Sequence, residues 1–111
     1  MKKGDLVAVD FPFTDLTGRK KRPALVLAFD AGDVTLAFIT TQLFQARPPD
    51  VLLHPSVHNG LKLPSVIRTN KFATLKQTLI HGKLGELTPA ELLALDAGLV
   101  QSLDIKIPSK T

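Results

Sequence analysis

The chain has 111 residues, of which 44% are hydrophobic and 22% are charged, and its formal net charge is +4. These values are ordinary for a globular protein, so we expect a single domain over residues 1–111 and exclude wholesale disorder. No apolar run approaches the roughly 20 residues that span a bilayer. The N-terminal lysines resemble the start of a signal peptide, but Asp5 and Asp10 leave no apolar stretch after them. We therefore expect a cytoplasmic protein with no membrane partner.

The basic balance, with a pI of about 9.6, favours an anionic partner such as nucleic acid. The absence of cysteine excludes disulfides, thiolate zinc sites and cysteine nucleophiles. His54 and His58 have the spacing of metal ligands on a helix, but Pro55 and the turn signal Asn59-Gly60 argue against a helix there. The sequence indicates no third ligand, so we expect neither a metal nor another cofactor.

The first predicted strand is Leu6–Val9, and it is followed by a loop over residues 11–18 that is marked by Pro, Thr, Asp and Gly. The loop is long enough to be functional. Phe11 and Phe13 in this loop are either anchors on the core or an exposed surface for stacking bases, and anchoring is the commoner fate of such residues.

Three cations, Lys20-Lys21-Arg22, run directly into Pro23 and the apolar segment 24–27. The segment is short and rich in branched aliphatic residues, which predicts a buried strand. Because proline cannot donate a ladder hydrogen bond, we expect Pro23 at the first position of this strand. Arg22 is then held extended at the rim of the sheet, where it suits phosphate binding. The alternative is a solvated loop tip, the usual fate of short charge runs.

The turn at residues 30–33 leads into a third strand over Val34–Thr41, which we expect to form an antiparallel hairpin with the second strand. Alternation places residues 34, 36, 38 and 40 on one face and residues 35, 37, 39 and 41 on the other. In a tight hairpin the end of the third strand lies beside the start of the second. We therefore expect Thr40 to lie close to Arg22.

A polar loop over residues 42–50 is followed by strands at 51–53 and 65–73, a short helical turn at 75–78 and a last strand at 79–84. We interpret His81 in the last strand as a structural histidine rather than a general base. Thr88, Pro89 and Glu91 then form a helix start with a capping box. The stripe Leu92, Leu95, Leu99 and Leu103 predicts a helix that packs on the sheet.

These elements predict a mainly β fold: a small, strongly bent antiparallel sheet or partly open barrel, closed by one C-terminal α-helix. Residues 6–9 and 25–27 are apolar on both faces of their strands. This is more apolar surface than a half-covered sheet of this size needs, so we expect a homodimer.

The chain resembles the PemK/MazF family of toxins in five blocks that keep their order along nearly the whole sequence. These are Gly4-Asp5-Leu6-Val7, Lys21-Arg22-Pro23 with the strand after it, Phe38-Ile39-Thr40-Thr41-Gln42, Pro64-Ser65-Val66-Ile67-Arg68, and residues 79–87 with the following helix. The resemblance implies an SH3-like barrel and a homodimer. It also implies a sequence-specific, metal-independent endoribonuclease of a type II toxin-antitoxin system, which a cognate antitoxin neutralises. Operator DNA would be bound only through the complex with the antitoxin.

The resemblance implies that Arg22 and Thr40 are catalytic, and that the ribose 2′-hydroxyl of single-stranded RNA attacks the adjacent phosphodiester. Some relatives carry a Glu before the Arg-Pro block, whereas this loop offers only Asp15 as a carboxylate, so Asp15 is the candidate for proton transfer. The residues we expect to bind RNA are Lys20, Lys21, Thr41, Gln42, Arg47, Ser65, Arg68 and Lys71.

Two other functions are compatible with such a barrel. One is a non-catalytic CcdB-like poison of DNA gyrase, and the other is a nucleic-acid-binding module without activity. The Arg22 and Thr40 pair favours the endoribonuclease, because a gyrase poison has no need of it.

Overall fold

The computed structural model describes residues 1–12 and 21–108. Its elements, in chain order, are β1 (Asp5–Asp10), β2 (Lys21–Asp30), β3 (Asp33–Thr40), the 3₁₀ turn η1 (Leu43–Gln45), β4 (Val51–Leu53), β5 (Ser65–Lys76), the 3₁₀ turn η2 (Gln77–Leu79), β6 (Ile80–Glu86) and α1 (Pro89–Ser102). None of the helices in these residues is long and apolar enough to cross a membrane.

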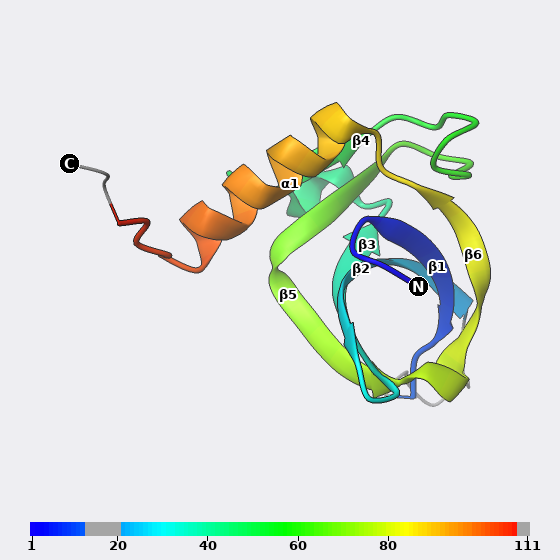
Figure 1. Ribbon diagram of the computed structural model, residues 1–111. Coiled ribbons are helices and arrows are strands. Elements are labelled where there is room, and N and C mark those ends of the chain that lie inside the picture. Colours follow the sequence, from blue (N-terminus) through cyan, green and yellow to red (C-terminus); the bar gives the residue numbers. More distant parts are fainter. Residues whose placement is uncertain (13–20, 109–111) are drawn as a thin grey trace.

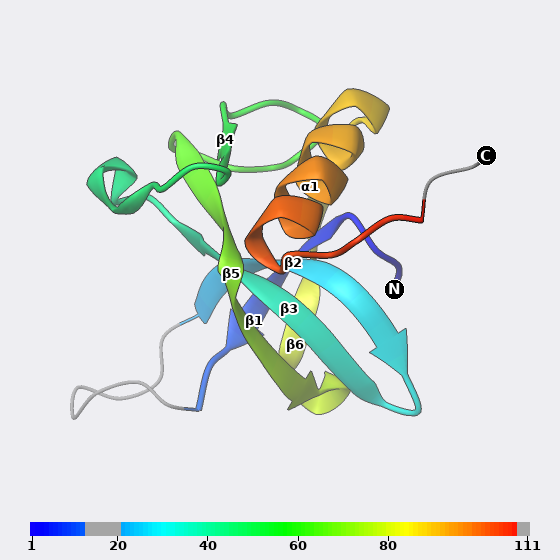
Figure 2. The ribbon, with the colours of Figure 1, turned by 90° about the vertical axis from the view of Figure 1, so that its left-hand side faces the viewer.

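The strands form one six-stranded antiparallel sheet in the order β4-β5-β3-β2-β1-β6. The sheet curls into a ring, and Figure 1 looks down the axis of this ring. No ladder joins the edge strands β4 and β6, so the barrel stays open. The helix α1 lies outside the ring, beside β4 and β5 (Figure 2). The predicted fold class, a bent antiparallel sheet with one C-terminal helix, is confirmed.

The β2/β3 hairpin closes through a two-residue turn between Asp30 and Asp33. Ala31 (φ 50°) and Gly32 (φ 85°) both have positive φ, as a type I′ turn requires. The prediction that Pro23 opens the strand is wrong, because β2 begins two residues earlier and Pro23 pairs with Ala8 of β1. The ladder between β2 and β3 begins only at Ala24, so Pro23 has no strand partner on that side of β2. The sheet therefore tolerates the missing N–H of Pro23.

Both faces of the central strands are buried within the chain. One face carries a cluster that includes Val9, Val26 and Leu36, and the other carries a cluster in which Leu25 is joined by Leu95 of α1. The predicted alternation along β3 is therefore confirmed. Because α1 and the curled sheet cover both apolar faces, these faces no longer argue for a dimer.

Strand β5 contains a bend that the sequence does not predict. Ala37 of β3 pairs with Phe72, but Ile39, two residues further along β3, pairs with Ile67. Residues 68–71 therefore bulge out of the ladder, and β5 changes direction there. At its far end, β5 continues to Lys76, and the helical turn predicted at 75–78 is a 3₁₀ turn at Gln77–Leu79.

The helix α1 begins at the predicted capping box, in which the Thr88 hydroxyl accepts from Glu91 N and the Glu91 carboxylate accepts from Thr88 N. Leu95 is fully buried. Leu103 is the C-cap and is half exposed, so the apolar stripe ends before the position predicted. Gly98 is buried where α1 lies close to β5 and to the loop before β4: a Cβ there would lie 3.0 Å from Thr69 Cγ2 and 2.9 Å from the Pro49 carbonyl oxygen.

We predict that Thr88→Ala lowers the free energy of unfolding by about 1 kcal/mol, because the first turn of α1 loses its cap. Thr88→Ser should retain most of the stability. Urea unfolding measures the change, with Thr78→Ala as a control at an exposed threonine outside any helix cap. Equal effects of Thr88→Ala and Thr78→Ala would contradict the role of the cap.

Candidate functional site

Arg22 and Thr40 lie where the hairpin strands β2 and β3 leave each other. Their ladder ends at Ala24 and Phe38, and the same register, continued by two residues, sets Arg22 opposite Thr40. Each is still held by its other neighbour, since Arg22 pairs with Val9 of β1 and Thr40 with Val66 of β5. Arg22 is exposed and Thr40 is partly buried. The backbone of both residues is therefore held in the sheet just past the end of the β2/β3 ladder.

The hydroxyl of Thr40 accepts a hydrogen bond from the backbone N–H of Gln42 at 3.0 Å. A hydroxyl has one proton to donate and two lone pairs, so this bond leaves its proton for another partner. The bond also folds residue 42 back over the end of β3. Thr40 thus connects the sheet to the polar loop that follows it.

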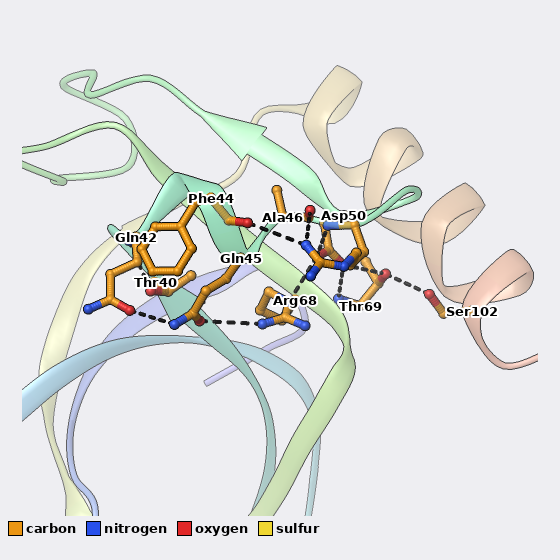
Figure 3. Close-up of polar contacts among 10 residues, drawn as sticks. Thr40, Gln42, Phe44, Gln45, Ala46, Asp50, Arg68, Thr69 and Ser102 are labelled. Carbon is orange, nitrogen blue, oxygen red and sulfur yellow. Dashed lines mark hydrogen bonds and ion pairs between the residues drawn. The ribbon is translucent and has the colours of Figure 1, made fainter.

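The loop between β3 and β4 is tied together by its own polar groups (Figure 3). The Gln45 side-chain amide donates to the Gln42 side-chain oxygen. The guanidinium of Arg47 donates to the Phe44 and Ala46 carbonyls at 3.3 and 2.9 Å. These bonds curl the loop around η1 and leave its outer surface to solvent.

Phe44, in η1, is 78% exposed, the largest exposure of any phenylalanine in the described part of the chain. It follows Gln42 by two residues, so it lies close to Thr40 along the loop. Phe11 is instead buried, with its ring 4.9 Å from that of Phe38, which confirms that Phe11 is an anchor. Phe13 lies outside the described residues. The sequence signal for Phe44 is an apolar pair, Leu43-Phe44, inside an otherwise polar loop.

A buried ion pair stands behind this loop. Arg68 Nε lies 2.9 Å from Asp50 Oδ2, and the two side chains are 11% and 4% exposed. The contact is an ion pair rather than an aligned hydrogen bond, because Nε has no hydrogen-bond partner by geometry. The β4/β5 register Val51↔Ile67, continued by one residue, sets Asp50 opposite Arg68. The pair therefore forms at the bend of β5.

The Asp50 carboxylate also accepts hydrogen bonds from three other groups. Oδ2 accepts from Arg47 N at 2.9 Å, and Oδ1 accepts from Thr69 N at 2.9 Å and from the Thr69 hydroxyl at 3.1 Å. Burial alone would raise the pKa of Asp50, but these hydrogen bonds and the charge of Arg68 outweigh it and hold the pKa below its ordinary value. Asp50 is therefore ionised at neutral pH.

The remaining predicted RNA-binding residues fall into two groups. Arg68 and Ser65 are buried, and the Ser65 hydroxyl donates to the Leu63 carbonyl. Arg68, which we expected to bind RNA, has its charge paired with that of Asp50. The exposed group comprises Lys21, Thr41, Gln42, Arg47 and Lys71. Lys20 and Asp15 lie outside the described residues.

A second charged cluster lies on β1 and β6, where the carboxylate of Asp5 is buried between Lys2 and Lys83 at 3.4 Å each. Burial would raise the pKa of Asp5, but hydrogen bonds from both lysines lower it. A recess beside this cluster is lined by residues that include Met1, Gln77 and His81, and it includes neither Arg22 nor Thr40. Within residues 1–12 and 21–108, no three acidic or histidine side chains converge as a metal site.

Comparison with known proteins points to one family. Residues 2–103 match the model of the PemK-like, MazF-like toxins of type II toxin-antitoxin systems. No curated protein matches the sequence of the chain.

Solved structures of low sequence identity share the fold. An endoribonuclease in complex with its cognate antitoxin from a mycobacterial species is 22% identical, with a TM-score of 0.76 over 97% of this chain and 99% of that one. The toxin MazF-mt6 of Mycobacterium tuberculosis is 23% identical, with a TM-score of 0.73 over 93% and 99% of the two chains. A MazE–MazF structure from Deinococcus radiodurans is 22% identical, with a TM-score of 0.75 over 96% and 97%.

We predict that Asp50→Asn destabilises the fold in a pH-dependent manner. Removing one partner of a buried pair costs about 3–5 kcal/mol. The pKa of Asp50 is lowered in the folded state. Its contribution to the free energy of unfolding is therefore complete above the ordinary pKa of 3.8 and is lost as the pH falls through the folded-state pKa. Urea unfolding should therefore show a large gap between parent and variant at pH 7.

As the pH falls below 3.8, the unfolded parent binds a proton at Asp50 before the folded parent does, which favours unfolding of the parent but not of the variant, so the same gap should shrink. The matched control is Asp104→Asn, at a carboxylate that is 83% exposed and paired with Lys106. Surface pairs contribute little, so this control should change the stability by less than about 1 kcal/mol at either pH. An Asp50→Asn gap that stays constant from pH 7 to pH 3 would contradict the role of the ionised pair.

Proposed function

Because the chain belongs to the family of PemK-like, MazF-like toxins of type II toxin-antitoxin systems, we propose that it is an endoribonuclease. It cleaves single-stranded RNA at short, specific sequences without a metal ion. The proposal rests on the register of β2 and β3: their ladder ends at Ala24 and Phe38, and continuing it by two residues pairs the exposed Arg22 with Thr40. The mycobacterial relative described as an endoribonuclease lends support.

The proposed reaction is an internal transfer of the phosphodiester. The ribose 2′-oxygen attacks the adjacent phosphorus, its proton passes to a base, and the bond from phosphorus to the 5′-oxygen breaks. The leaving oxygen takes up a proton, so the products are a 2′,3′-cyclic phosphate and a free 5′-hydroxyl. The enzyme must stabilise the negative charge of the phosphorane and assist both proton transfers.

Arg22 suits the first task, because its planar guanidinium is permanently charged and can donate two parallel hydrogen bonds to phosphate oxygens. Thr40 can donate its hydroxyl proton to a phosphate oxygen or orient the 2′-hydroxyl, since its present bond to Gln42 N uses only a lone pair. The high pKa of a hydroxyl makes Thr40 a poor base. Asp15 remains the candidate for proton transfer.

The RNA strand would lie across exposed cations. Lys21, Arg47 and Lys71 would offer charges to the phosphates, while Thr41 and Gln42 would offer hydrogen bonds to bases or sugars. Lys20, which precedes Lys21 in the sequence, is a further candidate for a phosphate contact. The chain contains neither Trp nor Tyr. We assign base stacking to the exposed ring of Phe44, because stacking on an aromatic side chain contributes about 1–3 kcal/mol per base.

We further propose that the protein acts in the cytoplasm as a homodimer and is neutralised by a cognate antitoxin. Support for the antitoxin comes from two similar structures, the mycobacterial endoribonuclease with its cognate antitoxin and the MazE–MazF structure from Deinococcus radiodurans. Operator DNA would be bound only through the complex with the antitoxin.

We predict that Arg22→Ala lowers the rate of RNA cleavage by about 10² or more, the usual cost of losing one preorganised charge donor. Arg22→Lys should recover little, because a point charge does not replace the guanidinium fork. Thr40→Ala should also impair cleavage, whereas Thr40→Ser should retain part of the rate. If both groups act on one transition state, the two losses should be less than additive.

To measure cleavage, purified protein is incubated with a long RNA in the presence of EDTA, and the products are separated by gel electrophoresis. Circular dichroism checks that each variant is folded. Cleavage at the parental rate by both folded alanine variants would overturn the assignment of Arg22 and Thr40. A folded parent that leaves RNA intact but inhibits DNA gyrase would favour the CcdB-like alternative.

We predict that RNA binding weakens steeply with salt, because each phosphate neutralised on a single strand contributes about −0.7 to the slope of log K against log salt concentration. Lys71→Gln should reduce the magnitude of the slope by about this amount, and so should Arg47→Gln. Lys106→Gln is the matched control, at a lysine of the exposed C-terminal segment. Fluorescence anisotropy with a non-cleavable RNA gives the slopes. A flat salt dependence of the parent would contradict this binding surface.

A further inference from the structure

Arg68 and Asp50 are too deeply buried to be ordinary surface contacts. The two oxygens of Asp50 face Arg68 and accept hydrogen bonds from Arg47 and Thr69. Burying two charges costs several kcal/mol per ion unless further hydrogen bonds compensate. Apolar side chains could fill the same space without this cost. We therefore looked for groups that the pair holds in place.

On one side, the pair leads to Thr40 through two glutamines. Arg68 Nη1 faces the side-chain oxygen of Gln45 at 3.5 Å, and the amide of Gln45 donates to the side-chain oxygen of Gln42. The backbone N–H of Gln42 then donates to the Thr40 hydroxyl. Figure 3 shows these side chains in one line from the bend of β5 to the end of β3. Arg68 is therefore the buried end of a path to the proposed site.

On the other side, the pair is anchored to the helix. The Thr69 hydroxyl lies 2.7 Å from the Ser102 hydroxyl at the last residue of α1. Gly98 of α1 lies close against Thr69, where a Cβ would be 3.0 Å from Thr69 Cγ2. Asp50 also closes the end of the polar loop, since Arg47 N donates to its carboxylate and Asp50 N donates to the Arg47 carbonyl. The loop is thus attached to a point fixed by helix and sheet.

We propose that Arg68 is a positioning residue for RNA cleavage, which acts through Gln45 and Gln42 to hold the loop and the Thr40 hydroxyl in the arrangement that the reaction needs. The inference rests on the proposed endoribonuclease function. Arg68 does not contact the RNA. Its fork uses one nitrogen to face Asp50 and another to face Gln45, a geometry that lysine cannot reproduce.

The first experiment measures kcat and KM for RNA cleavage by two variants that keep the buried charges, Gln45→Ala and Arg68→Lys. A displacement of about 1 Å near reacting groups can cost 10² in rate. We expect kcat to fall about tenfold to 10² in both variants while KM changes less than threefold. The matched control is Gln101→Ala, at an exposed glutamine of α1, and it should cleave at the parental rate. Parental kcat in folded Gln45→Ala and Arg68→Lys would overturn the proposal.

The second experiment separates positioning from phosphate binding. In Asp50→Asn/Arg68→Gln both charges are removed together, which avoids an unpaired buried ion. If Arg68 positions the loop, the salt slope of RNA binding should equal that of the parent although cleavage is impaired. A slope smaller in magnitude by about 0.7 would show that Arg68 neutralises a phosphate and would overturn the proposal.

The third measurement does not depend on activity. Amide hydrogen exchange by NMR should show at least threefold faster exchange of the Gln42 N–H in Gln45→Ala and Arg68→Lys, but not in Gln101→Ala. Unchanged exchange in both would overturn the positioning role. If the parent does not cleave RNA, the proposed function fails, and this measurement alone then decides whether Arg68 holds the loop.

Discussion

The arrangement of the polar loop between β3 and β4 and of the bend in β5 depends on the ionised carboxylate of Asp50. The Asp50 carboxylate accepts hydrogen bonds from Arg47 N and from the two donors of Thr69, and it forms an ion pair with Arg68. These donors come from the polar loop and from the bend of β5, where the ladder with β3 is interrupted. The N–H of Thr69 loses a strand partner at this bulge, and the side chain of Asp50 replaces it. One residue thus compensates for the bend and fixes the loop.

The sheet supplies rigidity, and the loop supplies chemistry. Two apolar clusters cover the two faces of β2 and β3, so these strands are fixed from both sides. The proposed catalytic residues stand just past the last paired residues of the two strands, where side chains reach solvent while the backbone remains held by β1 and β5. Mobile or adaptable groups on a rigid frame are the usual arrangement of binding sites. Here the loop after β3 carries Gln42 and Phe44 to the same place.

The fold was predictable where periodicity and turn residues act locally. Alternation along β3, the turn at Asp30–Asp33 and the capping box at Thr88 each depend on neighbours within a few residues, and all three are as expected. The hairpin register that relates Arg22 to Thr40 follows from the same local signals. The ion pair between Asp50 and Arg68 was not predictable, because it depends on a β4/β5 register and a bulge that joins residues 18 positions apart in the sequence. Charge alone made Arg68 resemble a surface residue, and only burial distinguishes it from Arg47.

The open ends of the sheet have a consequence for how the protein behaves when it is concentrated. An open barrel leaves two edge strands whose free N–H and C=O groups are templates for aggregation with other chains. Here β4 is only three residues long, and the ladder between β6 and β1 is broken by two irregularities. Most of the side chains of β6 are exposed, and they include the paired charges of Lys83 and Glu86. Short length, irregular register and charge each discourage strand addition, so the barrel can remain open without polymerising through its edges.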